Sequence, residues 1–145
     1  MDTCEHSSRD RGRLLFRGAA MLMGVLPLVL LGTARTLTPN SEGLGTHQQL
    51  GLPPCSMRVL AGIRCPGCGM TTSWAYFTRG HWLSSMQVNI GGFLLALASL
   101  YVAFLSLRSA WAGVMPSMQT QRTLTFYMVG IVVVTILEWI RRLLA

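Results

Sequence analysis

The chain has 145 residues and a formal net charge of +7, and 51% of its residues are hydrophobic while only 12% are charged. Soluble domains carry roughly 25% charged residues, so this composition excludes an ordinary soluble domain and predicts an integral membrane protein embedded in the lipid bilayer. The basic residues are all arginines, scattered or flanking apolar runs. Nucleic-acid binding needs a clustered basic face with interleaved aromatic residues, so we expect no nucleic-acid partner.

The first membrane span is predicted at residues 14–34, after a polar and basic tail at residues 1–13 that we expect to be disordered. The uncharged stretch that follows Arg17 is long enough to cross a bilayer as a helix, and Pro27 should kink it. A cleaved signal peptide is the alternative, because residues 32–34 (Gly-Thr-Ala) resemble a small-residue cleavage site. The length of the apolar run favours a retained anchor.

Two further spans are predicted toward the C-terminus. Residues 88–107 contain no charge and are apolar on all sides, as a lipid-embedded helix should be. Residues 108–123 form a connecting loop, and residues 124–144 form the third span. We therefore predict an all-α integral membrane protein with three transmembrane helices.

The distribution of arginines is the feature of the sequence that bears on the orientation in the membrane. The arginines divide evenly between the two sides, so the positive-inside rule does not decide between the two orientations. The arginine cluster at the N-terminus favours a cytoplasmic N-terminus, with the loop after the first span on the oxidising side of a bacterial inner membrane. In the third span, Glu138 lies within reach of Arg141 and Arg142, which predicts an ion pair at the membrane interface.

The loop at residues 35–87 is too long for a plain connector and should carry structure. A first short helix should start at the pair Pro53-Pro54 and end at Gly62. A second should be capped by Thr71 or Thr72 and end at Gly80. Both helices are amphipathic, so we expect them to lie at the membrane interface on either side of a cysteine-containing turn.

The turn contains Cys65-Pro66-Gly67-Cys68-Gly69, and three hypotheses compete for it. It could be half of a zinc site that Cys55 and either His81 or His47 complete. It could be the redox pair of a thiol–disulfide oxidoreductase, with Cys68 as the nucleophile near a helix N-terminus and Cys65 as its resolving partner. It could also be structural, with a local disulfide or buried small side chains that fix the turn, in a loop that contacts unidentified membrane proteins. We favour a non-enzymatic structural or metal-binding role.

The sequence around this turn resembles a known family. Gly62-Ile63-Arg64-Cys65-Pro66-Gly67-Cys68-Gly69-Met70-Thr71-Thr72, followed by Arg79-Gly80 and by Asn89 at the start of an apolar helix, is similar to the hallmark of bacterial membrane proteins grouped as domain of unknown function 2752. The resemblance covers residues 50–107 and implies a small membrane protein that shares this motif. It implies no particular activity.

Overall fold

The computed structural model describes the backbone of residues 2–144 and the side chains of residues 11–144. Within that part of the chain the fold is all-helical and contains no strand. The elements in chain order are α1 (Asp2–Thr36), the 3-10 helix η1 (Thr46–Leu50), α2 (Ser56–Ala61), α3 (Met70–Phe77), α4 (Trp82–Val88), α5 (Ile90–Ala112) and α6 (Met118–Leu144).

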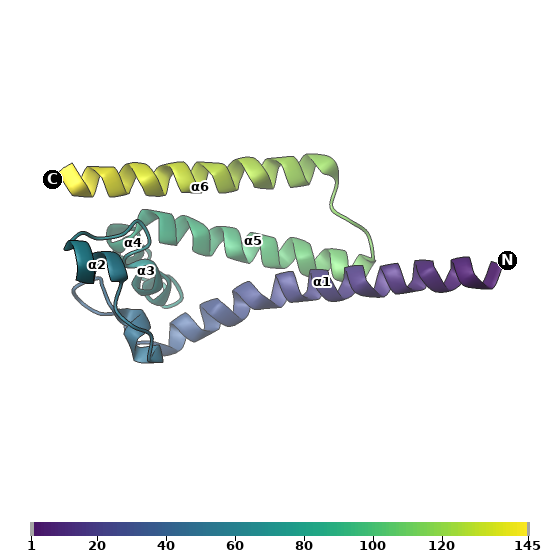
Figure 1. The fold of residues 1–145 in the computed structure, drawn as a ribbon, viewed down its shortest axis with the longest axis horizontal. Coiled ribbons are helices and arrows are strands. Elements are labelled where there is room, and N and C mark those ends of the chain that lie inside the picture. Colours follow the sequence, from purple (N-terminus) through teal and green to yellow (C-terminus); the bar gives the residue numbers. More distant parts are fainter. Residues whose placement is uncertain (1, 145) are drawn as a thin grey trace.

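Three of these helices are long and apolar enough to cross a membrane, namely α1 from Arg11 onward, α5 and α6. Figure 1 shows the short helices gathered at one end of these three, where α1 ends and α5 begins. The C-terminus lies at the same end and the N-terminus at the other (Figure 1). The predicted all-α fold with three membrane-spanning helices is confirmed.

The long helices extend beyond the predicted spans. The expectation of a disordered tail was wrong, because α1 is helical from Asp2; adding a residue to an existing helix costs far less than nucleating a new one. The second long helix begins at Ile90 and continues to Ala112, where Gly113 takes a left-handed conformation with φ 68° and ends it. The third begins at Met118, six residues before the predicted start of that span.

The three long helices pack unequally. The most extensive contact joins α1 to α5, and a Cβ added at Gly24 there would lie 2.7 Å from Cγ of Leu107. Among the described helices α6 packs only against α5, and none of its residues is buried. The contact requires a glycine, because a Cβ at Gly91 would lie 3.0 Å from Cβ of Thr135. The third span is therefore held by this contact with α5 and by side-chain hydrogen bonds near its C-terminal end, where Trp139 donates to the Arg64 carbonyl and Arg142 to the Val88 carbonyl.

Arginine side chains cap the C-terminal ends of the helices. Arg17 donates to the carbonyls of Ala110 and Trp111 at the end of α5, each at 3.0 Å. Three further arginines do the same elsewhere: Arg35 donates to Thr78, Arg79 to Ala75 and Arg142 to Val88. Carbonyls in the last turn of a helix lack a backbone N–H partner within that helix and carry the negative end of the helix dipole. Arginine side chains therefore satisfy carbonyl groups at the C-terminal ends of α3, α4 and α5.

The predicted ion pair at Glu138 is present. Its carboxylate accepts from Arg141 at 2.8 Å and from Arg142 at 3.0 Å. Because Arg142 also donates to Val88 at 3.0 Å, this pair connects α6 to the end of α4. Glu138 thus orients Arg142, which extends from α6 to cap the C-terminal end of α4.

We expect Gly91→Ala to destabilise the protein by about 1–3 kcal/mol, because the added methyl group forces α5 and α6 apart. Gly130→Ala is the matched control, since a Cβ there meets nothing within 4 Å. Thermal unfolding in detergent, followed by circular dichroism, measures both variants. An unchanged midpoint for Gly91→Ala would show that α6 is not seated on this glycine.

Candidate metal centre

The segment from η1 to α2 forms a strap beside α3, which we define as residues 46–55. Gly45 and Gly51 flank η1 with φ of 80° and 76°, a conformation that glycine adopts without strain. The buried hydroxyls of Thr46 and Thr72 are hydrogen-bonded at 2.8 Å and pin the strap to α3. The prediction that Thr71 or Thr72 caps α3 was wrong, because the capping position belongs to Gly69 and the Thr72 hydroxyl is used for this tertiary contact.

The cysteine turn is closed by its own backbone and held by one side chain. The Cys68 amide donates to the Cys65 carbonyl at 3.0 Å. The amide nitrogen Nδ2 of Asn89 donates to the carbonyls of Pro66 at 3.2 Å and Cys68 at 3.1 Å. Oδ1 of the same residue accepts from the Gly92 amide at 2.8 Å and so caps α5. A single buried amide, 4% exposed, thus joins the turn to the start of a spanning helix.

The helix after the turn, α3, packs against α4 and the start of α5 through its buried residues Thr72, Ser73 and Ala75. Ser73, which is fully buried, bonds to the Ser85 hydroxyl of α4 at 2.8 Å. Trp74 donates its indole N–H to the Gly92 carbonyl at 2.8 Å, and Phe77 meets Phe93 edge to face at 5.6 Å. The helix α4 was not predicted from the sequence, and its seven residues contain no glycine or proline.

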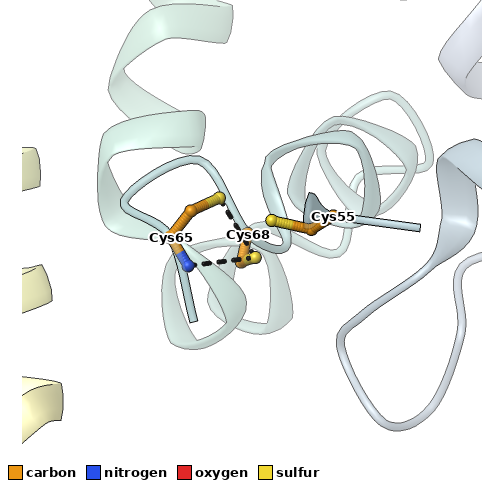
Figure 2. A group of neighbouring side chains, drawn as sticks. All are labelled: Cys55, Cys65 and Cys68. Atoms are coloured by element: carbon orange, nitrogen blue, oxygen red, sulfur yellow. Dashed lines mark hydrogen bonds between the residues drawn. The ribbon is translucent and has the colours of Figure 1, made fainter. Parts of the chain in front are cut away.

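Three thiols converge at this turn. Figure 2 shows Cys55, which precedes α2, and Cys65 approaching Cys68 from opposite sides. All three Sγ atoms lie within 4.8 Å of one another, and all three cysteines are free and half-buried. The Cys65 and Cys68 sulfurs are 3.1 Å apart, well beyond the S–S bond of about 2.05 Å. Tetrahedral zinc–thiolate bonds of about 2.3 Å place sulfurs about 3.7 Å apart, so a shift of well under 1 Å for this pair accommodates such an ion.

The local electrostatics distinguish the thiols. The pKa of Cys55 is lowered to about 7, first by the backbone N–H of Arg58 in the opening turn of α2 and then by the Cys65 and Cys68 thiols. Burial, followed by hydrogen bonding to the other two thiols, raises the pKa of Cys65 to about 12. We predicted the helix N-terminus effect for Cys68; the structure places a lowered pKa on Cys55, which directly precedes a helix.

A half-open groove of about 380 Å³ runs along the cluster between the strap and the turn. Its walls include all three cysteines together with His47 and Arg58, and none of its lining residues is acidic.

The other predicted ligand lies apart from the groove. His81 precedes α4 and packs edge to face against Tyr76, with ring centroids 6.3 Å apart. It does not join the group of three sulfurs. The structure therefore brings together Cys55, Cys65 and Cys68, and places the other histidine considered from the sequence, His47, beside them.

Fold and site together define a helical membrane protein with three membrane-spanning helices and a three-cysteine cluster at one end that could hold a metal ion. Residues 55–103 match the model of the family described as "Protein of unknown function (DUF2752)". This match confirms the resemblance that the sequence motif indicated. The matching segment contains all three cysteines, α2 to α4 and more than half of α5. Neither a curated protein nor a solved structure matches the chain.

We expect Asn89→Asp to loosen the cysteine turn while keeping the cap of α5. The carboxylate still accepts from the Gly92 amide, but it cannot donate to the Pro66 and Cys68 carbonyls and repels them. A fully buried carbonyl left without a donor costs about 1–3 kcal/mol, and these two carbonyls are part-buried, so we expect a smaller cost for each. Asn89→Ala removes the cap as well, which adds about 1 kcal/mol.

Thermal unfolding in detergent should rank the wild type above both variants, and alkylation of Cys65 should accelerate in both. If Asn89→Asp matches the wild type in stability and in Cys65 protection, the Asn89 amide is not what holds the turn.

The pH dependence of alkylation checks the thiol environments in metal-free protein. Because the pKa of Cys55 is about 7, its thiolate fraction rises through neutral pH and its rate with iodoacetamide should level off above about pH 8. Cys65, with a pKa raised to about 12, should still be accelerating at pH 9. Peptide mass spectrometry after timed labelling gives both profiles. A Cys55 rate that keeps climbing tenfold per pH unit between pH 7 and pH 9 would contradict the lowered pKa.

Proposed function

We propose that this chain is a non-enzymatic protein of the bacterial inner membrane that binds one zinc ion through Cys55, Cys65 and Cys68. The observation that carries the proposal is the convergence of three free thiols within 4.8 Å. They lie at the end of the protein where α1 ends and α5 begins (Figure 1). Three thiolates are a soft donor set that suits zinc.

The packing of α2 supports a structural role for the ion. Among the described helices, α2 packs against none, and it has no buried residue. Its apolar residues Val59 and Leu60 are 64% and 86% exposed. Cys55 directly precedes this helix, whereas the other two ligands sit on the turn that Asn89 fixes. A metal ion bonded to all three would tie α2 to the rest of the protein, with its apolar face free for lipid or a membrane partner.

The charges around the cluster also favour metal binding. Thiols must lose their protons to become ligands, and the pKa of Cys55 is already lowered to about 7. Zinc with three thiolates carries a net charge of −1, and Arg58 on the wall of the groove offers a compensating charge. We therefore expect affinity to rise with pH as the remaining thiols deprotonate.

One observation favours a second candidate, a membrane thiol–disulfide oxidoreductase. The Cys65 and Cys68 sulfurs, at 3.1 Å, need to approach by only about 1 Å to form a disulfide. In that reaction the Cys68 thiolate attacks a partner disulfide, and Cys65 then displaces the partner thiol, which leaves a Cys65–Cys68 disulfide and a reduced partner. Cys55 has no assigned role in this scheme.

Elemental analysis of the detergent-purified protein tests the proposal. We expect about one zinc ion per chain, and a loss of affinity on the order of 100-fold or more for Cys55→Ser, Cys65→Ser or Cys68→Ser, since even changes in groups that only support a ligand cost 10–100-fold. Cys4→Ser, near the start of α1, is the control and should retain the metal.

Thiol counting on the same samples separates the two candidates. Masked thiols with bound zinc support the metal site. A protein that binds no zinc after loading, yet forms a Cys65–Cys68 disulfide reversibly between about −120 and −270 mV, would favour the oxidoreductase and overturn the metal proposal.

A further inference from the structure

The strap places one imidazole on the groove beside the thiols. Thr46 is 1% exposed and bonded to Thr72 at 2.8 Å, which fixes the start of η1 against α3. His47 is the next residue, half-buried, and lines the same groove as the three cysteines. The strap then continues through Pro53 to Cys55, so His47 and Cys55 lie near opposite ends of one short segment.

The hydrogen bond of His47 suits a metal ligand. Its Nε2 atom lies 3.2 Å from the Pro53 carbonyl oxygen. A carbonyl can only accept, so Nε2 carries the proton and Nδ1 keeps its lone pair. Histidine ligands in metal sites almost always donate their other ring N–H to a carboxylate, carbonyl or water, which fixes the tautomer. His47 already has this arrangement, and the carbonyl it uses belongs to the strap that leads into Cys55.

We infer that His47 supplies the fourth ligand, through Nδ1, and that the metal centre is a closed Cys₃His site. This inference rests on the proposed zinc function and deepens it. The ring lies outside the group of three sulfurs, so ligation requires the His47 side chain to move toward the cluster while Thr46 stays bonded to Thr72. Three thiolates and one neutral imidazole complete the tetrahedral shell typical of structural zinc, with no position left for substrate.

The other groove residues fit the fourth position less well. Met70 also lines the groove, but its thioether suits copper(I) better than zinc. Gln48 and Arg58, the polar side chains nearest in sequence, offer no nitrogen or sulfur ligand that zinc prefers. His81 packs against Tyr76 in front of α4 and is absent from the groove lining. It therefore provides a matched control for the loss of a histidine.

Cobalt(II) titration and zinc X-ray absorption of the full-length protein in detergent test the inference. Zinc absorption of the wild type should show three sulfur neighbours and one imidazole nitrogen, a result that needs no variant. His47→Ala should retain the thiolate-to-cobalt charge-transfer band, change the d–d bands, and lose affinity on the order of 100-fold. His47→Cys should restore tight binding with a stronger charge-transfer band, and His81→Ala should match the wild type.

The outcomes keep the two proposals apart. A wild type that binds zinc through three sulfurs and oxygen, or a His47→Ala variant with unchanged affinity and spectrum, would overturn the His47 assignment and leave the three-cysteine site standing. Loss of binding in His81→Ala but not in His47→Ala would also overturn it. A wild type that binds neither metal would refute both proposals.

Discussion

The buried side chain of Asn89 is the interaction on which the rest of this structure depends. Its amide nitrogen donates to two carbonyls of the cysteine turn, and its oxygen caps the spanning helix α5. An amide is the one neutral side chain that donates twice and accepts at once, which is what a junction between a turn and a helix start requires. Ionised aspartate cannot donate at all, and serine has only one proton to donate. The position of Cys65 and Cys68 is therefore set by a membrane helix and does not depend on the surrounding loop alone.

The membrane boundary explains the other conspicuous polar contacts. Helices that end near the lipid expose carbonyl groups that water solvates poorly. Arginines from distant parts of the chain satisfy these carbonyls, as Arg17 does for the end of α5 and Arg142 for the end of α4. Arginine is suited to this because it stays charged and presents several donors on a long stem. Because each of these arginines bonds to a carbonyl of another helix, the same contacts also hold the helices together.

The cysteine cluster lies between a turn that is anchored to α5 and a helix, α2, that is not packed against the other described helices. The turn is anchored by Asn89, whereas α2 packs on no other described helix. A metal bonded to Cys55, Cys65 and Cys68, as we propose, would join α2 to the turn. Under the proposed function, metal binding by the thiols would hold the exposed apolar residues Val59 and Leu60 in a defined position.

The sequence by itself determined the class of protein, the three spans and the cysteine turn, because long apolar runs and the Cys-x-x-Cys spacing act locally. It also determined that Gly62 ends α2, since a left-handed glycine terminates a helix wherever it lies. Tertiary structure alone decided which residues meet the turn. Cys55 arrives from ten residues away, His47 lines the groove while His81 does not, and Thr72 is used for Thr46 instead of a helix cap. These choices depend on how α3 and α4 pack beneath α5, and no local pattern encodes contacts between segments so far apart in the chain.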